Sequence, residues 1–506
     1  MPAIARNDGV STIAILELLT SLFLLVVGLV ILALIVLFVI DRSQRIDTVR
    51  RNYPVIGRMR YILSDLGEFF RQYFFAMDRE EMPFNRAQRE WVNEAAKAES
   101  TNVAFGSTQT LEPVGTPIFV NCPWPTLESE AHKIVPMTIG EGAARHPYEA
   151  PSFFNISGMS YGALSTPAVR ALSNGASKAG CWLNTGEGGL SPYHLEGGCD
   201  IVFQIGTAKY GVRDEDGQLS DDKLRAVAAH DQVKMFELKL SQGAKPGKGG
   251  ILPGAKVNAE ISAIRGIPEG EASISPNRHP DIGSSIELLD MIARIREVTG
   301  KPVGFKTVVG ASGWLETLFA EINRRGPESA PDFITVDGGD GGTGAAPLPL
   351  MDHVGLTLRE ALPMMVDLRN AAGLKDRIRI IASGKLVTPS EVAWALCAGA
   401  DFTITARGFM FALGCIQAMK CNKNTCPTGI TTHDPSLQRG LDPANKAVRV
   451  ANFVKQMHKE VGIIAHSVGV TRPRLMQRYH VRLVCADGRS RPLDELYPGV
   501  ENQGAS

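Results

Sequence analysis

The chain of 506 residues lacks an excess of charge of either sign. Lysine plus arginine number 53, and aspartate plus glutamate also number 53, so the formal net charge is zero at pH 7. The sequence contains no long basic stripe of the kind that neutralises the phosphates of a nucleic acid, so we expect no nucleic-acid partner. The length exceeds what one small core needs and indicates one large domain with additions, or two to three domains.

The sequence also lacks a regular framework of cysteines. Five of its eight cysteines are scattered along the chain, at Cys122, Cys181, Cys199, Cys397 and Cys485. Proteins held together by disulfides are typically short and secreted, with closely spaced cysteines. The scattered pattern in a chain this long therefore favours a reducing compartment.

The other three cysteines fall within one short run. Cys415, Cys421 and Cys426 have the spacing Cys-x5-Cys-x4-Cys-Pro, and a Pro-x-Gly turn ends the run. Three thiolates on a tight loop can converge on a soft metal centre such as an iron–sulfur cluster. No standard ferredoxin spacing matches, so the pattern leaves three options open: an iron–sulfur cluster, a zinc site, and three ordinary buried cysteines.

Charge is absent from residues 18–40, which read LLTSLFLLVVGLVILALIVLFVI. This run is long enough to cross a bilayer. A cleaved signal peptide would have a shorter apolar region ending in small residues. A core helix is disfavoured because every face is apolar and the run is terminal. Arg6 precedes the run, and four arginines follow it: Arg42, Arg45, Arg50 and Arg51. The excess of positive charge after the run predicts a single-pass membrane anchor with the following chain in the cytoplasm.

Five segments are expected along the chain. They are an N-terminal tail (1–17), a transmembrane helix (18–40), a helical and irregular segment (41–150), a barrel with the cysteine loop (151–440) and a C-terminal helical extension (441–506). Within the third segment, residues 41–100 indicate one or two amphipathic helices. These helices could lie on a membrane surface, but we favour their packing on the domain that follows.

From about residue 150, short apolar β-branched runs alternate with helical periodicity. Strands are expected at 153–156, 182–185, 201–205, 234–240, 302–309, 332–337, 378–382 and 402–406. Helices are expected at 167–179, 285–298, 312–324, 356–373 and 389–398. Eight strands with intervening helices predict a parallel (β/α)8 TIM barrel, with an open doubly wound sheet as the alternative. The segment 241–283, poor in periodic apolar residues, would then lie over the barrel mouth, where such enzymes carry out their chemistry.

Glycines and polar residues follow several of the expected strands. Those after the seventh and eighth strands, around Gly384 and Gly408, stand where barrels commonly bind phosphate, which favours a phosphate-bearing cofactor. The run Gly339–Gly344 also matches Gly-x-Gly-x-x-Gly, but Pro347 and Pro349 follow it instead of a helix start. A dinucleotide fingerprint would open a helix directly, so close approach of this backbone to a flat cofactor is the better interpretation.

From about residue 150 to 440 the sequence resembles the FMN-binding synthase domain of glutamate synthases. The motifs that carry the resemblance are Gly158-Met-Ser-Tyr-Gly-Ala-Leu-Ser165, Asn184-Thr-Gly-Glu187-Gly-Gly, Ser241-Gln-Gly-Ala-Lys245-Pro-Gly-Lys-Gly-Gly250, Leu252-Pro-Gly-Ala-Lys256-Val, Ser275-Pro276, Asp281-Ile282, Gly341-Gly-Thr-Gly-Ala345 and the cysteine run. They are long and stand in the family's order. The resemblance implies the barrel fold and a [3Fe-4S] cluster held by Cys415, Cys421 and Cys426.

The chemistry that the resemblance implies is the reductive amination of 2-oxoglutarate. Ammonia and 2-oxoglutarate would form 2-iminoglutarate, and reduced FMN would pass a hydride to it to give L-glutamate. The cluster would relay electrons to the flavin from an external donor, either ferredoxin or a reductase subunit.

Three residues match the family's substrate-binding and catalytic positions. Lys245 and Arg265 would bind the dicarboxylate, and Arg can grip a carboxylate with two parallel hydrogen bonds. Glu187 would lie near the reacting centre, where it could steer ammonia or manage protons. Taken without the family, Lys245 and Arg265 could be solvated loop charges, whereas Glu187 between glycines is hard to explain as part of a core.

The resemblance also assigns residues to the flavin. They are Ser157, Met159, Ser160, Gln242, Lys306, Gly341, Gly342, Thr343, Gly384, Lys385, Arg407 and Gly408. Lys306 would stand at the pyrimidine edge of the flavin and stabilise charge on the reduced ring, while Gly384, Arg407 and Gly408 would hold the phosphate. Lys306 also lies within an apolar strand, where a charge must find a partner, so the residue indicates a site by itself.

Two positions depart from the family pattern. The Gln that precedes the family's Leu-Pro-Gly turn is Ile251 here, which removes one polar contact to the substrate. The family's Asp-Gly-Gly phosphate turn is Ser383-Gly384-Lys385 here, and Lys385 can still serve a phosphate as a point charge. The first departure raises an alternative, in which the same cofactors act on a different 2-oxo acid or an amino-acid derivative.

Several parts of the complete family enzyme are not expected in this chain. We find no glutaminase domain with a nucleophilic N-terminal Cys, no NADPH- or FAD-binding domain, and no β-helical tail domain. The expected partners are therefore free ammonia or a separate glutaminase, together with the external electron donor. A further alternative is a non-catalytic electron-transfer subunit of a membrane complex.

Overall fold

The computed structural model describes residues 8–44, 46–75, 77–131 and 134–499 of the chain. The chain divides into two compact units, Met1–Arg86 and Ala87–Ser506. Parts of the expected N-terminal tail and C-terminal extension, including Arg6, lie outside the described residues, as does Arg45.

The first unit contains a long apolar helix. Helix α1 (Asp8–Ser43) includes the stretch Thr12–Ser43, which is long and apolar enough to span a membrane, with a mean hydropathy of 3.6 over its most apolar window. Helices α2 (Thr48–Asn52) and α3 (Ile56–Phe70) follow it, and η1 (Arg71–Phe75) continues α3 as a π-helical turn. The carboxylate of Asp41, near the end of α1, accepts hydrogen bonds from Arg50 and Arg58 at 2.6 and 2.7 Å.

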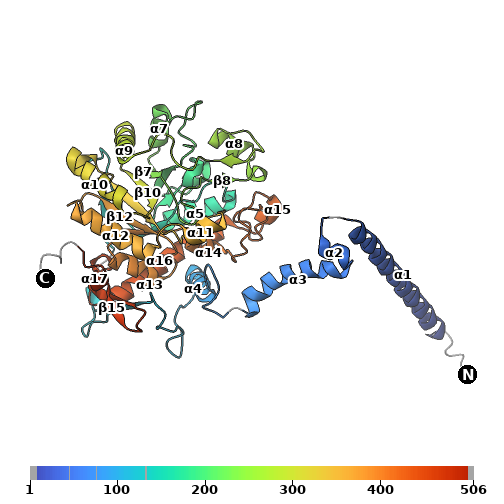
Figure 1. The fold of residues 1–506 in the computed structure, drawn as a ribbon. Helices are drawn as coiled ribbons and strands as arrows, with labels where there is room; N and C mark the ends of the chain where they lie inside the picture. Colours follow the sequence, from blue (N-terminus) through green and yellow to red (C-terminus); the bar gives the residue numbers. More distant parts are fainter. Residues whose placement is uncertain (1–7, 45, 76, 132–133, 500–506) are drawn as a thin grey trace, which may run out of the picture. The chain divides into compact units, whose positions relative to one another are not determined.

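The second unit is built on a closed barrel of eight parallel strands (Figure 1). The strands are β4 (Phe154–Ile156), β5 (Leu183–Asn184), β6 (Ile201–Ile205), β7 (Val233–Lys239), β10 (Val303–Val308), β11 (Phe333–Asp337), β12 (Arg379–Ser383) and β13 (Phe402–Thr405). The last strand, β13, pairs in parallel with the first, β4, with Thr403 opposite Phe154. This pairing confirms the predicted (β/α)8 barrel and excludes the open sheet.

Helices follow the barrel strands in sequence. The longer ones are α5 (Thr166–Ala179), α7 (Asp221–Ala228), α9 (Ser285–Thr299), α10 (Gly313–Arg325), α12 (Leu358–Ala371), α13 (Pro389–Cys397) and α14 (Arg407–Leu413); α6 (Pro192–Leu195) and α11 (Leu348–His353) are short. Helix α5 begins where the Ser165 hydroxyl accepts a hydrogen bond from the backbone N–H of Ala168, and it ends at Gly180 with φ of 69°. A side-chain N-cap and a left-handed glycine are common signals at the ends of helices. The predicted bounds of this helix, 167–179, are therefore close to those observed.

A hairpin packs against residues of the barrel interior, in a region that we expected to be irregular. Strands β2 (Met137–Ile139) and β3 (Tyr148–Ala150) pair antiparallel. Their side chains Ile139, Tyr148 and Ala150 belong to one buried cluster with Trp182, Val202, Met235, Phe333, Ile381, Phe402 and Ile404 of the barrel. Burial of these large apolar side chains provides much of the driving force for folding of this unit.

The C-terminal part of the chain is not wholly helical, contrary to the expectation for residues 441–506. Helix α16 (Pro443–Ser467) packs against α5, but β14 (Val481–Val484) and β15 (Ser490–Pro492) then form an antiparallel sheet with β1 (Pro117–Phe119). The short helices α15 (Pro435–Gln438) and α17 (Leu493–Leu496) stand on either side of these elements in sequence.

The two amphipathic segments before the barrel differ in burial. Helix α4 (Arg86–Lys97) buries Val92, Ala95 and Ala96, and the indole N–H of Trp91 donates to Glu460 on α16 at 3.0 Å. The packing that we favoured for this region therefore holds for α4. In α3, by contrast, Met59, Ile62 and Leu63 are more than half exposed.

The segment that follows β7 has little regular structure. It contains the two-residue strands β8 (Ile251–Leu252) and β9 (Ser273–Ile274), which pair antiparallel, and helix α8 (Ala259–Arg265). Because it leaves the carboxyl end of β7, this segment starts at the same end of the barrel as the loops after the other strands.

Candidate active site

A carboxylate and three cations gather at the carboxyl end of the barrel. Glu187 lies in a 3₁₀ turn, η3 (Gly186–Gly188), directly after β5. Its Oε1 is 2.9 Å from Nζ of Lys239, the last residue of β7. Lys245 and Arg265 are close enough to lower the pKa of Glu187 as well. The structure thus brings together the three residues predicted to be catalytic and adds Lys239, which the sequence reasoning missed.

Neighbouring glycines leave room for the Glu187 side chain. A Cβ placed on Gly250 would lie 2.3 Å from Oε1 of Glu187, and a Cβ on Gly206 would lie 2.5 Å from the Cβ of Glu187. Only 16% of the side-chain surface is exposed. Burial acts to raise the pKa of Glu187, but the attraction of Lys239, Lys245 and Arg265 outweighs it, so the pKa lies below its ordinary value. The group is therefore a carboxylate at neutral pH.

Lys245 and Arg265 are buried cations with unused hydrogen-bonding capacity. The Lys245 ammonium makes no ion pair or side-chain hydrogen bond with any residue that the structure describes. Burial, together with repulsion from Lys239, lowers the pKa of Lys245 to about 8. Buried cations without partners are costly unless a ligand supplies the missing charge.

Arg265 is held from two sides and keeps one donor free. Its Nη2 donates to the carbonyl of Tyr161 at 3.1 Å, and its Nη1 lies 3.3 Å from the hydroxyl of Ser273. Its Nε is buried and has no partner among the residues described here. The Ser273 hydroxyl in turn donates to Tyr210, whose ring lies 5.3 Å from the guanidinium carbon. These contacts fix the guanidinium group before any substrate binds.

A buried polar layer inside the barrel is formed around Glu237, in the middle of β7. This buried carboxylate accepts hydrogen bonds from Asn184 at 2.8 Å, Gln204 at 2.7 Å and Thr335 at 2.6 Å. A Cβ on Gly158 would lie 2.9 Å from both Asn184 and Gln204, so the loop after β4 passes directly over this layer. Sequence reasoning did not single out Glu237, although a glutamate inside an apolar strand was a visible signal.

Lys306 has the charged partner that its buried position requires. Its Nζ is 3.0 Å from Oδ2 of Asp337 on the neighbouring strand β11. Burial acts to lower the pKa of Lys306, but Asp337 and Glu237 outweigh it, so the pKa is raised and the ammonium stays charged. Asp337 Oδ2 also accepts a hydrogen bond from the N–H of Gly243 at 2.9 Å. The pair thereby joins the loop after β7 to the loop after β11.

The residues assigned to the flavin come from several of these loops. The amide of Gln242 donates to the hydroxyl of Thr343 at 2.9 Å, and a Cβ on Gly243 would lie 2.3 Å from the carbonyl of Gly338. Gly341 lies against Gly243, where a Cβ on Gly243 would come within 2.9 Å of its Cα. The backbone around these glycines is therefore packed closely, and a side chain at Gly243 would force the two loops apart.

The loops after β4, β12 and β13 carry the other flavin candidates. The N–H of Ser157 donates to Thr405 at the end of β13, and the N–H of Met159 lies 3.5 Å from the carbonyl of Asn184. After β12, Gly384 has φ of 130°, and Lys385 lies 3.7 Å from Asp340.

The two phosphate candidates after β13 have other partners in the structure. The N–H of Gly408 lies 3.3 Å from the hydroxyl of Thr405. Arg407 donates to the carbonyl of Thr343, and its Nη1 lies 3.8 Å from Sγ of Cys421. A Cβ on Gly342 would lie 3.1 Å from Nε of Arg407. Arg407 therefore connects the flavin loop after β11 with the cysteine loop.

The three clustered cysteines lie on one loop after α14. Burial raises the pKa of Cys415, whereas hydrogen bonds involving Thr428 and Thr431 outweigh burial and lower the pKa of Cys426. The thiols of Cys421 and Cys426 are close enough to Cys415 to contribute to its raised pKa. Within the described ranges, however, no group of three or more His, Cys, Asp and Glu side chains is arranged to hold a metal ion. The donor types suit an iron–sulfur cluster, but the ligand geometry is not formed here.

A buried lysine, Lys256, lies beside this loop. Its Nζ donates to the carbonyls of Thr431 at 2.5 Å, Cys421 at 2.9 Å and Ala163 at 3.4 Å. Burial lowers the pKa of Lys256 to about 8. Lys256 links the segment after β7 to the cysteine loop, a contact that the sequence could not reveal.

Comparisons with known proteins agree on one family. A family described as "Conserved region in glutamate synthase" matches residues 118–471. The chain is 38% identical over 517 residues to the glutamate synthase large subunit-like protein YerD of Bacillus subtilis, with 94% of this chain and 98% of that protein covered. It is 37% identical over 317 residues to the archaeal glutamate synthase [NADPH] of Methanocaldococcus jannaschii, which covers 62% of this chain and 58% of that protein.

Solved structures give a weaker likeness. A mandelate oxidase mutant with an FMN monooxide adduct has a TM-score of 0.42 at 16% identity, covering 84% of this chain and 99% of that chain. A flavocytochrome b2 mutant with benzoylformate has a TM-score of 0.44 at 13% identity, covering 79% of each chain.

Proposed function

The chain belongs to the glutamate synthase family of oxidoreductases, and we propose that it converts 2-oxoglutarate and ammonia to L-glutamate with reduced FMN. Ammonia condenses with the 2-oxo group to give 2-iminoglutarate and water. Addition of a hydride to the imine carbon and a proton to its nitrogen then gives the amino acid. The archaeal relatives are named glutamate synthases, but this chain spans only 58% of the Methanocaldococcus protein, so the whole reaction of those enzymes is part of the proposal.

The observation that carries the proposal is the group of cations around Glu187. Lys245 and Arg265 are buried at the carboxyl end of the barrel and retain unused donors. A 2-oxo dicarboxylate presents two carboxylates and a carbonyl oxygen, which match such donors. We assign one carboxylate to Arg265, and the carbonyl region to Lys245, whose ammonium would polarise the oxo group for attack by ammonia.

Glu187 is the group that we assign to proton handling. As a carboxylate it can attract an ammonium ion and accept the proton that must leave before nitrogen attacks the carbonyl carbon. It can return a proton when water leaves and when the imine is reduced. Lys239, at 2.9 Å, keeps Glu187 ionised and in place for these transfers.

The residues around the mouth also fit a bound FMN, which would supply the hydride. The close approach of Gly243 and Gly341 brings the loops after β7 and β11 together, and we assign the flavin ring to the backbone of these loops. We assign the pyrimidine edge of the ring to Lys306, held by Asp337 at 3.0 Å. The remaining contacts are assigned to the loops that carry Ser157, Met159, Ser160, Gln242, Gly342, Thr343, Gly384, Lys385, Arg407 and Gly408.

We further propose a [3Fe-4S] cluster on Cys415, Cys421 and Cys426, which would receive electrons from a ferredoxin or a reductase subunit. The thiols lie on one loop, and the loop is tied to Lys256 and Arg407. Two cations beside three thiolates reduce the electrostatic cost of assembling a negatively charged centre. Arg407 also contacts the carbonyl of Thr343, so the cysteine loop adjoins the proposed flavin loop.

We propose that α1 anchors the protein in a membrane with the barrel in the cytoplasm. The apolar stretch Thr12–Ser43 has the required length. Arg50 and Arg58 converge on Asp41 at its end, which satisfies the buried carboxylate where the helix would leave the bilayer. The arginines that follow α1 favour the cytoplasmic side for this end.

One residue favours a second candidate, in which the substrate is a different 2-oxo acid or an amino-acid derivative. Ile251 stands on β8, next to Gly250, which touches Glu187. Its side chain is 45% exposed, and it is paired with Ile274, which is 67% exposed. An apolar residue on this hairpin would suit a substrate with an apolar group better than the second carboxylate of 2-oxoglutarate.

The two candidates are separated by an anaerobic experiment on the detergent-purified protein. After its visible and EPR spectra are recorded, the protein is reduced chemically and mixed with ammonium and 2-oxoglutarate. Reoxidation of the flavin coupled to glutamate formation supports the first candidate, whereas reoxidation only by other members of a 2-oxo acid panel supports the second. In Arg265→Ala the flavin should stay bound while turnover falls by ~10- to 100-fold, as expected for a lost charged hydrogen bond. Full turnover in that variant would refute the substrate assignment.

A further inference from the structure

A cavity lies beside the amino-terminal ends of the barrel strands, away from the candidate active site. It has a volume of about 340 Å³ and is lined by residues of β2, by Phe153 just before β4, by Arg379 at the start of β12, and by Arg472–Leu475. Because parallel strands start at one end of a barrel and finish at the other, this cavity and the Glu187 site are on opposite faces. A volume of this size is within the range of small-molecule sites.

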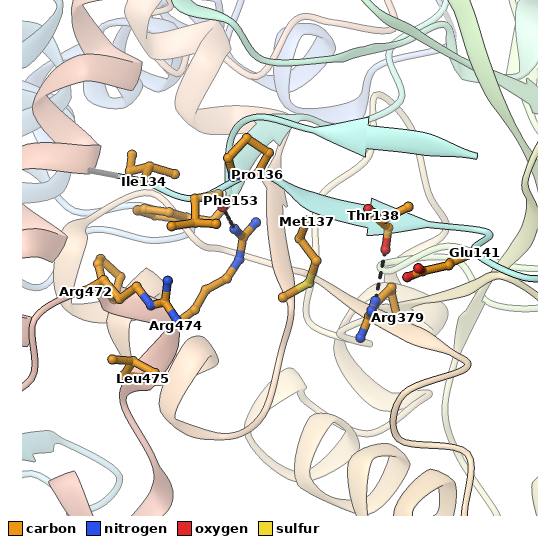
Figure 2. A pocket seen from close by; sticks show the side chains of 12 residues that line it. Ile134, Pro136, Met137, Thr138, Glu141, Phe153, Arg379, Arg472, Arg474 and Leu475 are labelled. Atoms are coloured by element: carbon orange, nitrogen blue, oxygen red, sulfur yellow. Dashed lines mark hydrogen bonds between the residues drawn. The ribbon is translucent and has the colours of Figure 1, made fainter. Parts of the chain in front are cut away.

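Three arginines from two separate parts of the chain line this cavity: Arg379, Arg472 and Arg474. In Figure 2, Arg472 and Arg474 lie on one side of Met137 and Arg379 lies on the other. No ion pair joins any of them to a carboxylate in the part of the chain that the structure describes. Glu141 is the one acidic residue that lines the cavity, so its lining carries an excess of two positive charges.

Arg474 shows most directly that these charges are incompletely compensated. Its Nε donates to the carbonyl of Asp401 at 3.0 Å and its Nη1 to that of Val135 at 2.6 Å. Its Nη2 is buried and has no hydrogen-bond partner among the described residues. Burial, together with repulsion from Arg379 and Arg472, lowers the pKa of Arg474 to about 10 despite the attraction of Asp401.

The other two arginines differ in how firmly they are held. Arg379 donates from Nε to the carbonyl of Thr138 at 3.1 Å, as Figure 2 shows, which leaves its terminal nitrogens available. Arg472 makes no hydrogen bond or ion pair through its side chain within the described residues. A side chain without such contacts can turn toward an incoming ligand at little cost to the fold.

The geometry points to a binding site for a small organic dianion, either a dicarboxylate or a phosphate ester. Guanidinium groups match the oxygens of carboxylate and phosphate with paired hydrogen bonds. Met137, Pro136 and Phe153 supply an apolar wall for the body of such a ligand. The site is distinct from the proposed substrate site, because none of its residues belongs to the group around Glu187. A ligand here would not block the barrel mouth.

The test is a binding titration on the full chain in detergent, by calorimetry and by thermal shift. The probes are inorganic phosphate, adenosine monophosphate, succinate and citrate, so that the panel separates phosphate esters from dicarboxylates. We expect at least one probe to bind the wild type with a Kd below about 1 mM and to raise its Tm. If none of the four does so, the proposal is overturned.

Substitutions of the cavity arginines test whether the probe binds in this cavity. Arg472→Gln should weaken binding by about tenfold or more, because one charged hydrogen bond is lost, while the Tm of the free protein stays unchanged. Arg379→Gln is the second variant and should weaken binding similarly. Arg170→Gln is the matched charge control. Arg170 is an exposed arginine on the outer helix α5 and pairs with Glu196, so its replacement should leave binding of the probe unchanged.

Lys245→Ala distinguishes this site from the active site. Binding of the probe should survive in this variant, even if 2-oxoglutarate no longer supports turnover. Wild-type affinity in both Arg472→Gln and Arg379→Gln, or loss of binding in Lys245→Ala, would overturn the proposal without affecting the proposed reaction.

Discussion

Nζ of Lys239 lies 2.9 Å from Oε1 of Glu187, although the two residues are 52 positions apart in the chain. The lysine ends β7 and the glutamate follows β5, so the barrel itself brings them together. The contact contributes most to keeping Glu187 ionised, because burial acts to raise the pKa of that carboxyl and Lys239 opposes it more strongly than Lys245 or Arg265 does.

The first prediction concerns this pair. In Lys239→Met the pKa of Glu187 should rise, because the nearest cation is gone while burial remains. The acidic limb of the kcat/KM profile should therefore move to higher pH, with a loss of about ten- to hundredfold at neutral pH. Lys239→Arg, which keeps the charge, is the control and should keep the wild-type profile. An unchanged acidic limb in Lys239→Met would show that Glu187 is not the titrating group.

The second prediction concerns Lys245, whose pKa is lowered to about 8. The ammonium is charged below this pH and neutral above it, so it attracts an anionic substrate only on the acidic side. The KM for the 2-oxo acid should therefore rise as the pH increases through about 8, and kcat should fall because the neutral amine no longer polarises the oxo group. In Lys245→Arg the group stays charged and this rise should disappear. A KM that rises identically in the variant would assign the titration to another group.

The third prediction concerns the cysteine loop. Substituting Ser for Cys415, Cys421 or Cys426 singly should lower the iron content and abolish the EPR signal of the cluster, because Ser is a poor ligand for iron–sulfur centres. Cys397→Ser is the matched control, since Cys397 is buried in α13, outside the loop. Equal iron content in the loop variants and in Cys397→Ser would exclude these cysteines as ligands.

The fourth prediction concerns Ile251. Ile251→Gln places an amide where the family has one, so the kcat/KM for 2-oxoglutarate should rise relative to that for an apolar 2-oxo acid such as 2-oxoisocaproate. One added hydrogen bond corresponds to a change of about tenfold in this ratio. Ile251→Val preserves the apolar surface and should leave the ratio unaltered. If the two variants give the same ratio, position 251 does not select the substrate.

The fifth prediction concerns α1. Replacing both Leu25 and Leu29 with Arg places two charges near the centre of the apolar stretch, at a cost of roughly 2.5–3.5 kcal/mol each by insertion scales. The protein should then leave the carbonate-resistant membrane fraction. The double replacement with Ile keeps the stretch apolar and should remain there. Retention of the Arg variant would show that α1 is not the anchor.

Much of the barrel could be predicted from local sequence. All eight strands and five of the outer helices have a clear periodicity, with caps such as Ser165 and Gly180 at their ends. Glu187 could also be singled out locally, because it stands between glycines, whereas Lys245 and Arg265 were assigned only through the resemblance to the glutamate synthase family. Periodicity and caps depend on residues close together in the chain, so they can be predicted from the sequence alone.

The sequence could not pair these residues with their partners. Lys239 was visible only as one of three charged residues in the expected strand 234–240, and its contact with Glu187 depends on how the loop after β5 turns toward the end of β7. The same holds for Lys256, which reaches carbonyls of Cys421 and Thr431 more than 160 positions away. Arg379 and Arg472 lie 93 positions apart and line one cavity only because the C-terminal segment folds back beside the start of β12. The local pattern thus determined the elements and the candidate residues. Only tertiary packing decided which charges meet, since the pKa values and unused donors of buried groups depend on neighbours that are distant in the sequence.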